Sequence, residues 1–459
     1  MLQSKLSMAD IHPFRAFRYD PRRVSPAEVV TQPYDKITAT LQDRYYAANP
    51  YNLVRIILGR KENSDNSANN VYSRAAAHFG DWRQQGILRR DALPSLYIYS
   101  QRFTLPGSTK EGSTKEGATT ELERRGFIAL GRIEDYSAGV VFRHEQTLAK
   151  PKADRLDLLR ATRAHFGQIF MLYEDSGEVE SLLASPVTES TIEITDEYGV
   201  VHRVWQVSDA KLIDSVRGEM RDKKLVIADG HHRYETALTY RNERRGADSS
   251  SARPTPGSSG SPYEFVMMTF VNMNSPALRI LPTHRVVQGL SEFSEDDFRK
   301  SARAYFDVDE VDPSLDAPRA TAILRESGRC GTSILAVTGS RAFLLHHPNP
   351  NTPEIFAGLS IRQQGLDVVQ LHKCLLEKVL KLSEESIRNQ QNISYVRDAA
   401  EALSLVRGEG GTRANIAFLL NPCRVAQVRD IAFAGEVMPQ KSTDFYPKLL
   451  SGLTTYALD

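Results

Sequence analysis

A chain of 459 residues is too long for one ordinary domain and long enough for two or three, each with its own core. Lys and Arg number 58 against 57 Asp and Glu, and the net charge of +1 argues against a protein drawn to nucleic acid by its overall field. The three cysteines are odd in number and far apart, which excludes a disulfide framework and a CxxC metal pair.

The N-terminal region lacks the continuous apolar segment of a signal peptide. No stretch of the sequence approaches the roughly 18–20 apolar residues that span a bilayer. We therefore expect a cytoplasmic protein without a membrane partner. The sequence predicts no particular oligomeric state.

Short apolar runs alternate with segments of helical period, which predicts an α/β fold, with a mixed α+β arrangement as the alternative. Residues 54–58, apolar except for Arg55, form a run of strand length, and residues 71–82 repeat apolar side chains with helical period. Residues 96–103 and 126–133 alternate like the strands of a hairpin. Residues 106–120 contain STKEG twice in tandem and are expected to form a disordered hairpin tip.

The rest of the chain repeats this alternation of strands and helices. Strands are expected at residues 168–173, 225–228, 264–272, 333–337, 341–345 and 416–420. Helices are expected from about residue 231, at 294–306 after a capping-box pattern, at 367–380 and at 425–434. We expect an N-terminal α/β region at 1–245, a flexible loop at 246–263 and a second α/β region at 264–459.

The segment IADGHHRYETAL, residues 227–238, has the order strand, tight turn, helix. The first N–H groups of such a helix lack partners within the helix and lie at the positive end of its dipole, which suits a phosphate or carboxylate. Gly230 permits a backbone conformation that other residues resist and lets a ligand approach the main chain. The turn is therefore the expected binding site for phosphate or nucleotide.

The side chains of this turn add chemistry of their own. Arg233 provides a clamp for phosphate oxygens. His231 and His232 suit phosphate contact or proton transfer near neutral pH, and Asp229 suits a base or a ligand of Mg²⁺. The alternative is that Asp229 merely caps the helix. We favour a functional site, because four polar residues with a glycine exceed what a cap requires.

Other polar segments supply candidates for the same site. In RHEQT, residues 143–147, the functional interpretation places Glu145 opposite the turn as an acid or metal partner, and the alternative is a solvated loop. Turn chemistry at QPYDKI and a strand end at LPTHR favour substrate contacts there, although a connector or ordinary surface would look the same. The candidate substrate-binding residues are Tyr34, Asp35, His144, Thr147, Arg155, Thr283, His284 and Arg285.

The segment QKSTDFYPK concentrates groups that suit an anion and is expected to contribute to the site. Its candidate phosphate-binding residues are Lys441, Ser442, Thr443 and Lys448. Gly435 precedes them at the spacing of a P-loop, but Pro439 and Gln440 prevent the cradle of backbone N–H groups, and a P-loop is not expected. The alternative is a surface segment that packs Phe445 and Tyr446 on the body of the protein.

A histidine pair, His346-His347, follows the expected strand at residues 341–345. The sequence places no carboxylate or cysteine at ligand spacing from this pair. We therefore expect no metal site there.

Several motifs resemble known families. GHHRYETA resembles the GERRxRAA-type box of the ParB and sulfiredoxin superfamily, with Gly230, Arg233 and Ala237 in matching positions, and DGHHR resembles the turn of its free-serine kinases. Over nearly its full length the chain is similar to the bacterial and archaeal family known as domain of unknown function 1015. The segments that carry this similarity are QPYDKI (32–37), NPYNLVRIILG (49–59), RHEQTLAKPKADRLDLLRAT (143–162), IADGHHRYETAL (227–238), LPTHRVV (281–287), GLDVVQLH (365–372) and MPQKSTDFYPKLLSGL (438–453).

The resemblance implies a ParB/sulfiredoxin-like catalytic core with large α/β additions. It also implies a kinase that uses ADP or ATP with Mg²⁺, in which Asp229 and His232 are catalytic and Glu145 is the candidate for a separate acidic residue. His232 and Glu235 replace two arginines of the ParB-type box, which argues against a CTP-dependent DNA clamp.

The leading hypothesis is a phosphotransferase that acts on a small hydroxyl metabolite, with free L-serine or O-phosphoserine as the first candidate. The alternative is a non-catalytic sensor that binds a phosphorylated metabolite at the same turn. A ParB-like protein that associates with nucleic acid is a third hypothesis, and the near-neutral charge argues against it.

Overall fold

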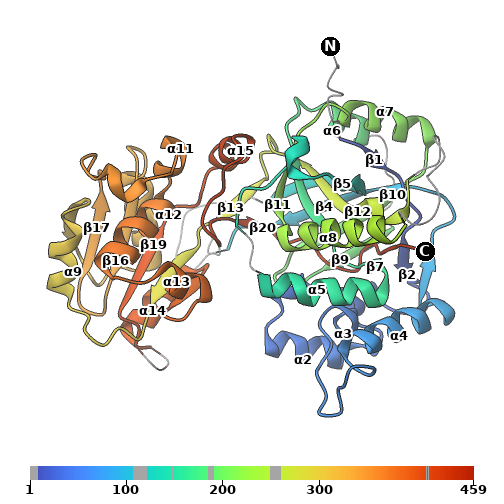
Figure 1. Ribbon diagram of the computed structural model, residues 1–459, viewed down its shortest axis with the longest axis horizontal. Coiled ribbons are helices and arrows are strands. Elements are labelled where there is room, and N and C mark those ends of the chain that lie inside the picture. Colours follow the sequence, from blue (N-terminus) through green and yellow to red (C-terminus); the bar gives the residue numbers. More distant parts are fainter. Residues whose placement is uncertain are drawn as a thin grey trace, which may run out of the picture. The chain divides into compact units, whose positions relative to one another are not determined.

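The computed structural model describes residues 9–106, 121–146, 149–184, 191–248, 260–409, 411 and 413–459, apart from the side chains of residues 149–151 and 353. Two compact units make up the chain (Figure 1). The first comprises Met1–Phe142, Thr147–Leu278 and Pro447–Asp459, and the second comprises Arg143–Gln146 and Arg279–Tyr446. Most of the expected hairpin tip at 106–120 and of the expected loop at 246–263 lies outside the described residues.

Nine strands of the described residues form one mixed sheet in the first unit, in the order β6-β11-β8-β12-β5-β4-β10-β9, with β1 beside β5. The pairs β6/β11 and β8/β12 are parallel and the others antiparallel. The strands are β1 (Ile11–His12), β4 (Leu96–Phe103), β5 (Leu122–Arg132), β6 (Val141–Phe142), β8 (Ile169–Tyr173), β9 (Ile192–Thr195), β10 (Val201–Val207), β11 (Leu225–Asp229) and β12 (Phe265–Asn272).

The strand at Phe265–Asn272 lies between β8 and β5, in the interior of this sheet. The sequence analysis placed it in the second region, whereas the boundary between the compact units lies at Leu278/Arg279. Spatial order explains the difference, because a strand that follows a long loop can insert between two earlier strands without leaving a mark in the sequence.

One face of this sheet is covered by α6 (Glu178–Leu183), α7 (Ala210–Met220) and α8 (His231–Asp248). Leu183, Met220 and Tyr234 of these helices share a buried core with Ile98 and Phe127 of the sheet. Along β4 the side chains alternate between the two faces. Residues that neighbour Ile98 therefore point to the opposite face, where residues 447–459 pack.

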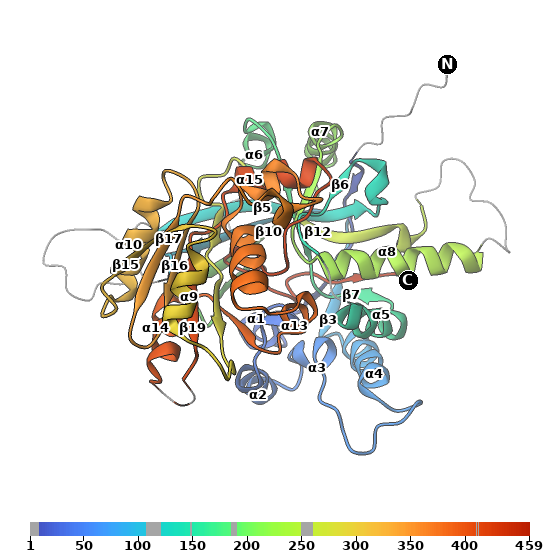
Figure 2. The same ribbon diagram turned by 60° about the vertical axis from the view of Figure 1, so that its left-hand side comes forward.

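A smaller layer of the first unit contains α4 (Val71–Gln84) and α5 (Ala149–Thr162), and α5 lies beside α8 in Figures 1 and 2. Its core includes Phe79, Trp82 and Phe166. The remaining elements of the unit are β2 (Phe17–Tyr19), α1 (Pro26–Val29), η1 (Tyr34–Lys36), α2 (Ala39–Ala48), α3 (Val54–Ile57), β3 (Leu88–Arg90), η2 (Tyr136–Ala138), β7 (Ala164–His165), η3 (Pro262–Glu264) and β21 (Tyr456–Ala457).

The strand expected at residues 54–58 is wrong, because Val54–Ile57 form the short helix α3. Asn52 starts this turn: its side-chain oxygen accepts a hydrogen bond from the Val54 N–H at 2.9 Å. A five-residue segment with four apolar residues has no period that separates a buried strand from a buried helical turn. The local hydrogen bonds therefore decide between them.

Six strands form the antiparallel sheet of the second unit, in the order β15-β17-β16-β19-β14-β18. They are β14 (His284–Val287), β15 (Asp307–Val311), β16 (Ser333–Val337), β17 (Ala342–His346), β18 (Ile393–Val396) and β19 (Ile416–Leu420), and a separate pair joins β13 (Arg279–Leu281) to β20 (Asp444–Tyr446). The helices are α9 (Glu295–Ala302), α10 (Ala317–Ser327), η4 (Pro353–Phe356), α11 (Ile361–Gln364), α12 (Asp367–Gln370), the π-helix η5 (Leu371–Val379), α13 (Glu384–Asn389), α14 (Ala399–Arg407) and α15 (Val425–Phe433).

The second unit confirms most of the elements expected there. The Ser294 hydroxyl caps α9 by accepting a hydrogen bond from the Asp297 N–H, although the helix ends at Ala302. Helices α10 and α14 cover one sheet face through Leu324 and Leu403. The mixed α/β fold is confirmed.

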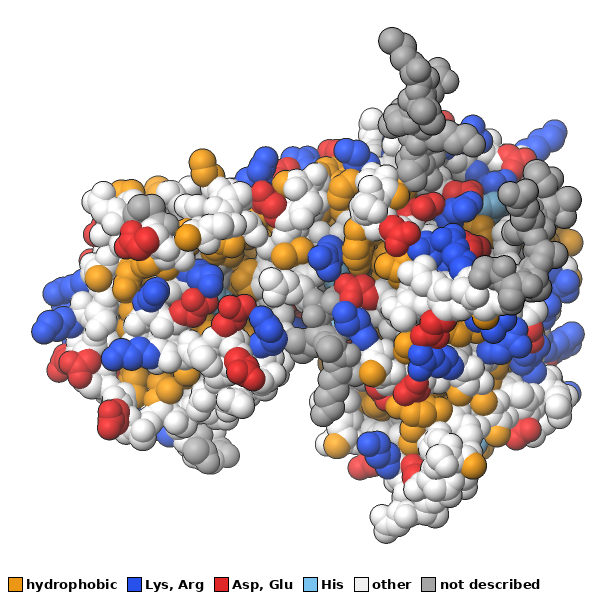
Figure 3. Space-filling model, viewed as in Figure 1, with side chains coloured by type: hydrophobic (Ala, Val, Ile, Leu, Met, Phe, Trp, Pro, Cys, Tyr) orange, Lys and Arg blue, Asp and Glu red, His pale blue; other side chains and the backbone are white. Residues whose placement is uncertain are grey.

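Charged side chains of both signs are mixed on the face shown in Figure 3, in keeping with the net charge of +1. Within the part of the chain that the structure describes, no helix combines the length and the apolar character that crossing a bilayer requires.

Candidate functional site

The turn predicted from DGHHR joins β11 to α8 in the first unit. Strand β11 ends at Asp229, Gly230 follows with a φ of +95°, and the 18-residue helix α8 begins at His231. The Gly230 carbonyl accepts the first helical hydrogen bond from the Tyr234 N–H at 2.9 Å. The predicted order of strand, tight turn and helix is therefore confirmed.

Gly230 is required for two independent reasons. Its positive φ lies in the region that side chains disfavour. A Cβ at this position would also lie 3.1 Å from the Arg233 guanidinium, which packs under the turn. Gly167 approaches the same guanidinium, and a Cβ there would lie 3.2 Å from the Nη1 atom. The two glycines thus make the space that Arg233 occupies.

Arg233 is held in this space by two acceptors. Its Nη2 donates to the Oδ2 atom of Asp229 at 2.7 Å, and its Nη1 donates to the Gln168 carbonyl. The Arg233 side chain, which carries further N–H groups, also lines an open pocket. Part of the expected phosphate clamp is therefore used to orient the arginine.

Asp229 bridges two cations. Its Oδ1 atom accepts a hydrogen bond from Lys448 Nζ at 3.0 Å, while Oδ2 faces Arg233. Burial favours the neutral acid, but the positive charges of Lys448 and Arg233 outweigh burial and hold the pKa of Asp229 below its usual value. Asp229 is therefore a permanent carboxylate that aligns the two cations, and its low pKa makes it a poor proton acceptor.

Lys448 reaches Asp229 because residues 447–459 return to the first unit. The Lys448 carbonyl accepts a hydrogen bond from Gln101 at 2.8 Å, and the Leu450 N–H donates to the Tyr99 hydroxyl at 3.3 Å. The Lys448 side chain is 9% exposed. These contacts thus hold the Lys448 ammonium group as a nearly buried positive charge.

Arg124 on β5 adds another buried cation that the sequence analysis missed. Its guanidinium, 1% exposed, donates to Gln101 and to the Pro447 carbonyl and packs over the Phe170 ring at 4.7 Å. Burial lowers the pKa of Arg124 to about 10, opposed by its interaction with Asp229. The alternation of side chains along β5 could have identified Arg124 from the sequence, because it puts Arg124 on the same face as buried Ile128.

A pocket of about 590 Å³ opens beside Arg233. Tyr34 lines it, and the Arg155 guanidinium stacks over the Tyr34 ring at 4.2 Å. Burial raises the pKa of Tyr34 to about 12, with Asp35 adding to the shift and Arg155 opposing it. Arg155 donates to Asp154 at 2.9 Å and to the Ile57 carbonyl at 2.6 Å, which fixes its position.

The pocket therefore brings several predicted residues together in one unit. Its wall joins apolar groups to cationic ones, with Tyr34, Arg155, Phe166, Gly167, Arg233 and Ser451 among its lining residues. Asp35 is exposed on the same short helix as Tyr34. His231 is buried and His232 is half-buried at the start of α8. Gln168, 1% exposed, carries an amide Nε2 without a hydrogen-bond partner among the described residues.

A second group of predicted residues lies in the second unit. The Oε1 atom of Glu145 accepts a hydrogen bond from the Ser442 N–H at 3.2 Å. The Nε2 atom of His144 lies 2.8 Å from the Thr443 hydroxyl, and the His144 carbonyl accepts from the Met438 N–H. The segments RHEQT and QKST are therefore neighbours, although about 300 residues separate them in the sequence.

Arg285 is the buried cation of this second group. Its Nη2 donates to the Lys441 carbonyl at 3.0 Å, and its Nη1 donates to the Thr283 carbonyl. The neighbouring His284 accepts a hydrogen bond from the Leu420 N–H at 3.2 Å, and burial lowers the pKa of His284 to about 4. His284 is therefore a neutral imidazole within the sheet. Its hydrogen bond with Leu420 explains its position, so that no substrate contact is needed to explain it.

Two sequence predictions have separate outcomes. Strand β20 follows Lys441 and Ser442 where a P-loop would continue into a helix, so the expectation that no P-loop forms is confirmed. Thr147, a candidate substrate contact, lies outside the described residues.

A pocket of about 340 Å³ in the second unit is lined by Arg285, Asp367 and Cys423. Burial raises the pKa of Asp367 to about 7, against hydrogen bonds from Ser333 and Thr332. An unfolded Asp ionises near pH 3.9, so this raised pKa destabilises the fold progressively as the pH rises from about 4 to 7.

The Asp367→Asn variant is therefore expected to unfold at a higher temperature than the wild type at pH 8 and at a similar temperature at pH 4. Thermal unfolding of both proteins across this pH range measures the difference. A stability difference that does not change with pH would contradict the raised pKa.

Mg²⁺ requires oxygen ligands, and at the turn the described carboxylate is Asp229, paired with two cations. Among the residues that the structure describes, the group of three or more His, Cys, Asp or Glu side chains at metal-binding distance lies elsewhere, at Asp307. Mg²⁺ is often held by one or two carboxylates together with substrate phosphates. Asp229 fits that arrangement only when a phosphate group supplies the other ligands.

Comparison with known proteins gives a family match. The model of the family described as "Protein of unknown function (DUF1015)" matches residues 11–369. No curated protein sequence matches the chain.

Several solved structures resemble the chain at low similarity. A conserved hypothetical protein from Pyrococcus furiosus has 10% identity and a TM-score of 0.33, covering 67% of this chain and 87% of its own. A free serine kinase in complex with AMP has 13% identity and a TM-score of 0.33, with coverage of 68% and 89%. SbnI with C-terminal truncation from Staphylococcus aureus has 9% identity and a TM-score of 0.32, with coverage of 71% and 85%. These values do not transfer an activity.

Proposed function

The chain belongs to the DUF1015 family, and from that premise we propose that it is a phosphotransferase whose phosphate site is the DGHHR turn of the first unit. The donor is a nucleotide, ADP or ATP, or another phosphoryl compound. The acceptor is a small hydroxyl metabolite, with free L-serine as the first candidate and O-phosphoserine as the donor in the reverse direction. The resemblance of DGHHR to the turn of free-serine kinases selects serine.

The observation that carries the proposal is an excess of positive charge around one carboxylate. Two cations contact Asp229 directly, two others act on it electrostatically, and a fifth lines the pocket beside Arg233. These cations are Arg233, Lys448, Lys36, Arg124 and Arg155. A chain with a net charge of +1 thus gathers cations beside the positive end of an 18-residue helix, which is the electrostatic environment that a phosphate group requires.

This arrangement suits phosphoryl transfer, because the reaction depends mainly on positioning and on stabilising charge at the oxygens of the transferred group. Arg233, Arg155 and the N–H groups at the start of α8 bind those oxygens. Asp229 keeps Arg233 and Lys448 aligned. Asp229 would also be the residue of the turn that holds a Mg²⁺ ion, which would neutralise charge on the transferred phosphate. The apolar wall of the pocket excludes water around the acceptor.

Two roles in the proposal rest on the sequence resemblance alone. Glu145 is the candidate that accepts the hydroxyl proton, and His232 is the candidate that assists proton transfer at the turn. Each role is tested by a substitution. Glu145→Gln and His232→Asn are both expected to lower turnover more than they raise the KM for the acceptor.

The direct test is an incubation of the purified chain with L-serine, Mg²⁺ and each of ADP, ATP and pyrophosphate. The reverse reaction starts from O-phosphoserine with AMP or ADP. Mass spectrometry of serine and O-phosphoserine is expected to show conversion with at least one donor. Absence of turnover in both directions with every donor would remove the serine assignment.

A sensor that binds a phosphorylated metabolite without reaction is the second candidate, and the ion pairs of Asp229 favour it, because they suit binding without proton transfer. Ligand-induced thermal stabilisation, measured together with turnover of the same ligand, separates the two candidates. A sensor is stabilised by O-phosphoserine or ADP but converts neither compound. An enzyme is stabilised by the same ligand and also turns it over.

A further inference from the structure

A second site lies at the edge of the six-stranded sheet in the second unit. Asp307 at the start of β15 and His346 at the end of β17 are cross-strand partners, and His347 follows directly. One ligand atom from each of these three residues lies within 4.8 Å of the others. We propose that Asp307, His346 and His347 bind a divalent transition-metal ion of the zinc type.

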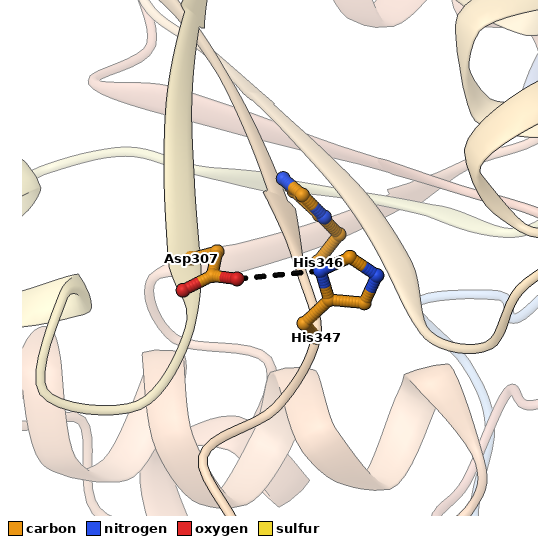
Figure 4. A group of neighbouring side chains, drawn as sticks. All are labelled: Asp307, His346 and His347. Carbon is orange, nitrogen blue, oxygen red and sulfur yellow. Dashed lines mark hydrogen bonds and ion pairs between the residues drawn. The ribbon is translucent and has the colours of Figure 1, made fainter.

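The conformation of His347 explains how adjacent histidines share one site. Successive side chains on a strand point to opposite faces, so two neighbouring histidines would normally diverge. His347 has a φ of +44°, which ends the strand alternation after His346. The two ring centroids consequently lie 4.4 Å apart, and Figure 4 shows the Asp307 carboxylate facing the His347 ring with the His346 ring next to it.

The distances fit a shared ion. Zinc binds imidazole nitrogen and carboxylate oxygen at about 2.0–2.2 Å, so two of its tetrahedral ligands lie about 3.3 Å apart. The Oδ2 atom of Asp307 lies 3.3 Å from Nδ1 of His347, which is long for a charge-assisted hydrogen bond. This pair already has the separation that a bridging ion needs, and the His346 ligand atom lies within 4.8 Å of both.

The surroundings of His346 support the same chemistry. Its Nε2 atom lies 2.9 Å from Oδ2 of Asp309, the next residue of β15 on the same side of the strand. Metal-binding histidines commonly donate their other ring N–H to a carboxylate, which fixes the tautomer. The bond to Asp309 therefore leaves Nδ1 of His346 as the ligand atom.

The residue types indicate which ions the site takes. Two imidazoles and one carboxylate favour Zn²⁺, Co²⁺, Ni²⁺ or Cu²⁺ over Mg²⁺ or Ca²⁺, which prefer oxygen ligands. The His347 side chain is 62% exposed, so water completes the coordination. Because β15 is an edge strand, the ion would clip this edge to β17.

The test measures Zn²⁺ binding by isothermal titration and Co²⁺ binding by visible absorption, using tag-free full-length chain stripped of metal with EDTA. The wild type is expected to bind one ion per chain. His347→Asn, which tolerates a positive φ, is expected to bind at least ten times more weakly. Asp309→Asn is expected to weaken binding less.

A matched control is His12→Asn in the first unit. His12 lies 2.8 Å from Asp10, and this histidine–carboxylate pair has no part in the three-residue cluster. His12→Asn is expected to bind Zn²⁺ like the wild type. Unchanged unfolding of metal-free His347→Asn shows that the variant folds. Failure of the wild type to bind Zn²⁺ or Co²⁺, or equal binding by wild type and His347→Asn, would overturn the proposal.

Discussion

Replacing Gly230 by Ala is expected to lower turnover at least about 100-fold and to weaken binding of phosphorylated ligands, while the protein remains folded. The methyl group would lie 3.1 Å from the Arg233 guanidinium, which would have to shift by a few tenths of an ångström relative to Asp229 and Gln168. The φ of +95° adds strain of about 1–3 kcal/mol. Steady-state kinetics, ligand-induced stabilisation and thermal unfolding measure these effects separately.

Gly199→Ala is the matched control for this substitution. Gly199 also has a positive φ, +75°, but a Cβ there meets no atom within 4 Å. The control therefore carries the backbone strain without the steric contact. We expect Gly199→Ala to unfold at a lower temperature but to keep ligand binding and turnover. Equal loss of ligand binding by both variants would show that ligand binding does not depend on the position of Arg233.

The Asp229→Asn variant is expected to lose turnover by several orders of magnitude and about 3 kcal/mol of stability. The carboxylate is 22% exposed and separates two cations, so the neutral amide leaves Arg233 and Lys448 facing each other without compensation. Denaturant unfolding measures the stability, and the serine assay measures the activity. Full turnover by Asp229→Asn would remove this carboxylate from the mechanism.

The Lys448→Met substitution tests how this loss arises. When Asp229→Asn and Lys448→Met are combined, the second change removes one of the uncompensated cations, so the double variant is expected to lose less stability than the sum of the single variants. Additive losses would show that the Asp229–Lys448 ion pair contributes no coupling. Unfolding of all four proteins under one condition gives the coupling free energy.

The pH dependence of Asp229→Asn has a defined sign. The folded pKa of Asp229 lies below the unfolded value near 3.9, so the carboxylate stabilises the fold fully above about pH 5. This stabilisation is lost as the pH falls through the lower, folded pKa. The stability difference between wild type and variant is therefore expected to be constant from pH 6 to 8 and to shrink in acid.

The turn itself could be predicted from the sequence because all its determinants are local. The apolar run of β11, the glycine and the polar start of α8 are contiguous, and the structure confirms their order. Ser294 is a similar case, since a cap and its helix lie within a few residues. In contrast, nothing local reveals that β12 lies between β8 and β5.

The candidate site shows the same limit. Asp229 ends β11 and Arg233 lies four residues later in the first turn of α8, and both could be identified from the sequence. Lys448 was predicted as a phosphate ligand, but its ion pair with Asp229 depends on the return of a distant segment. The proposed metal site could not be predicted from the sequence, because Asp307 approaches His346 only through strand pairing. Residues that meet only through tertiary contacts have no characteristic spacing in the sequence.

The return of residues 447–459 to the first unit has a consequence for biosynthesis. About 170 residues separate β12 from this segment. A ribosome must therefore translate the whole intervening unit before residues 447–459 can pack on the first unit. Until then the carboxylate at the turn lacks its lysine partner. Until residues 447–459 are made, the first unit therefore lacks the contacts of Lys448 and Leu450 with its sheet, and proteolytic removal of this short segment would remove the same contacts from the mature protein.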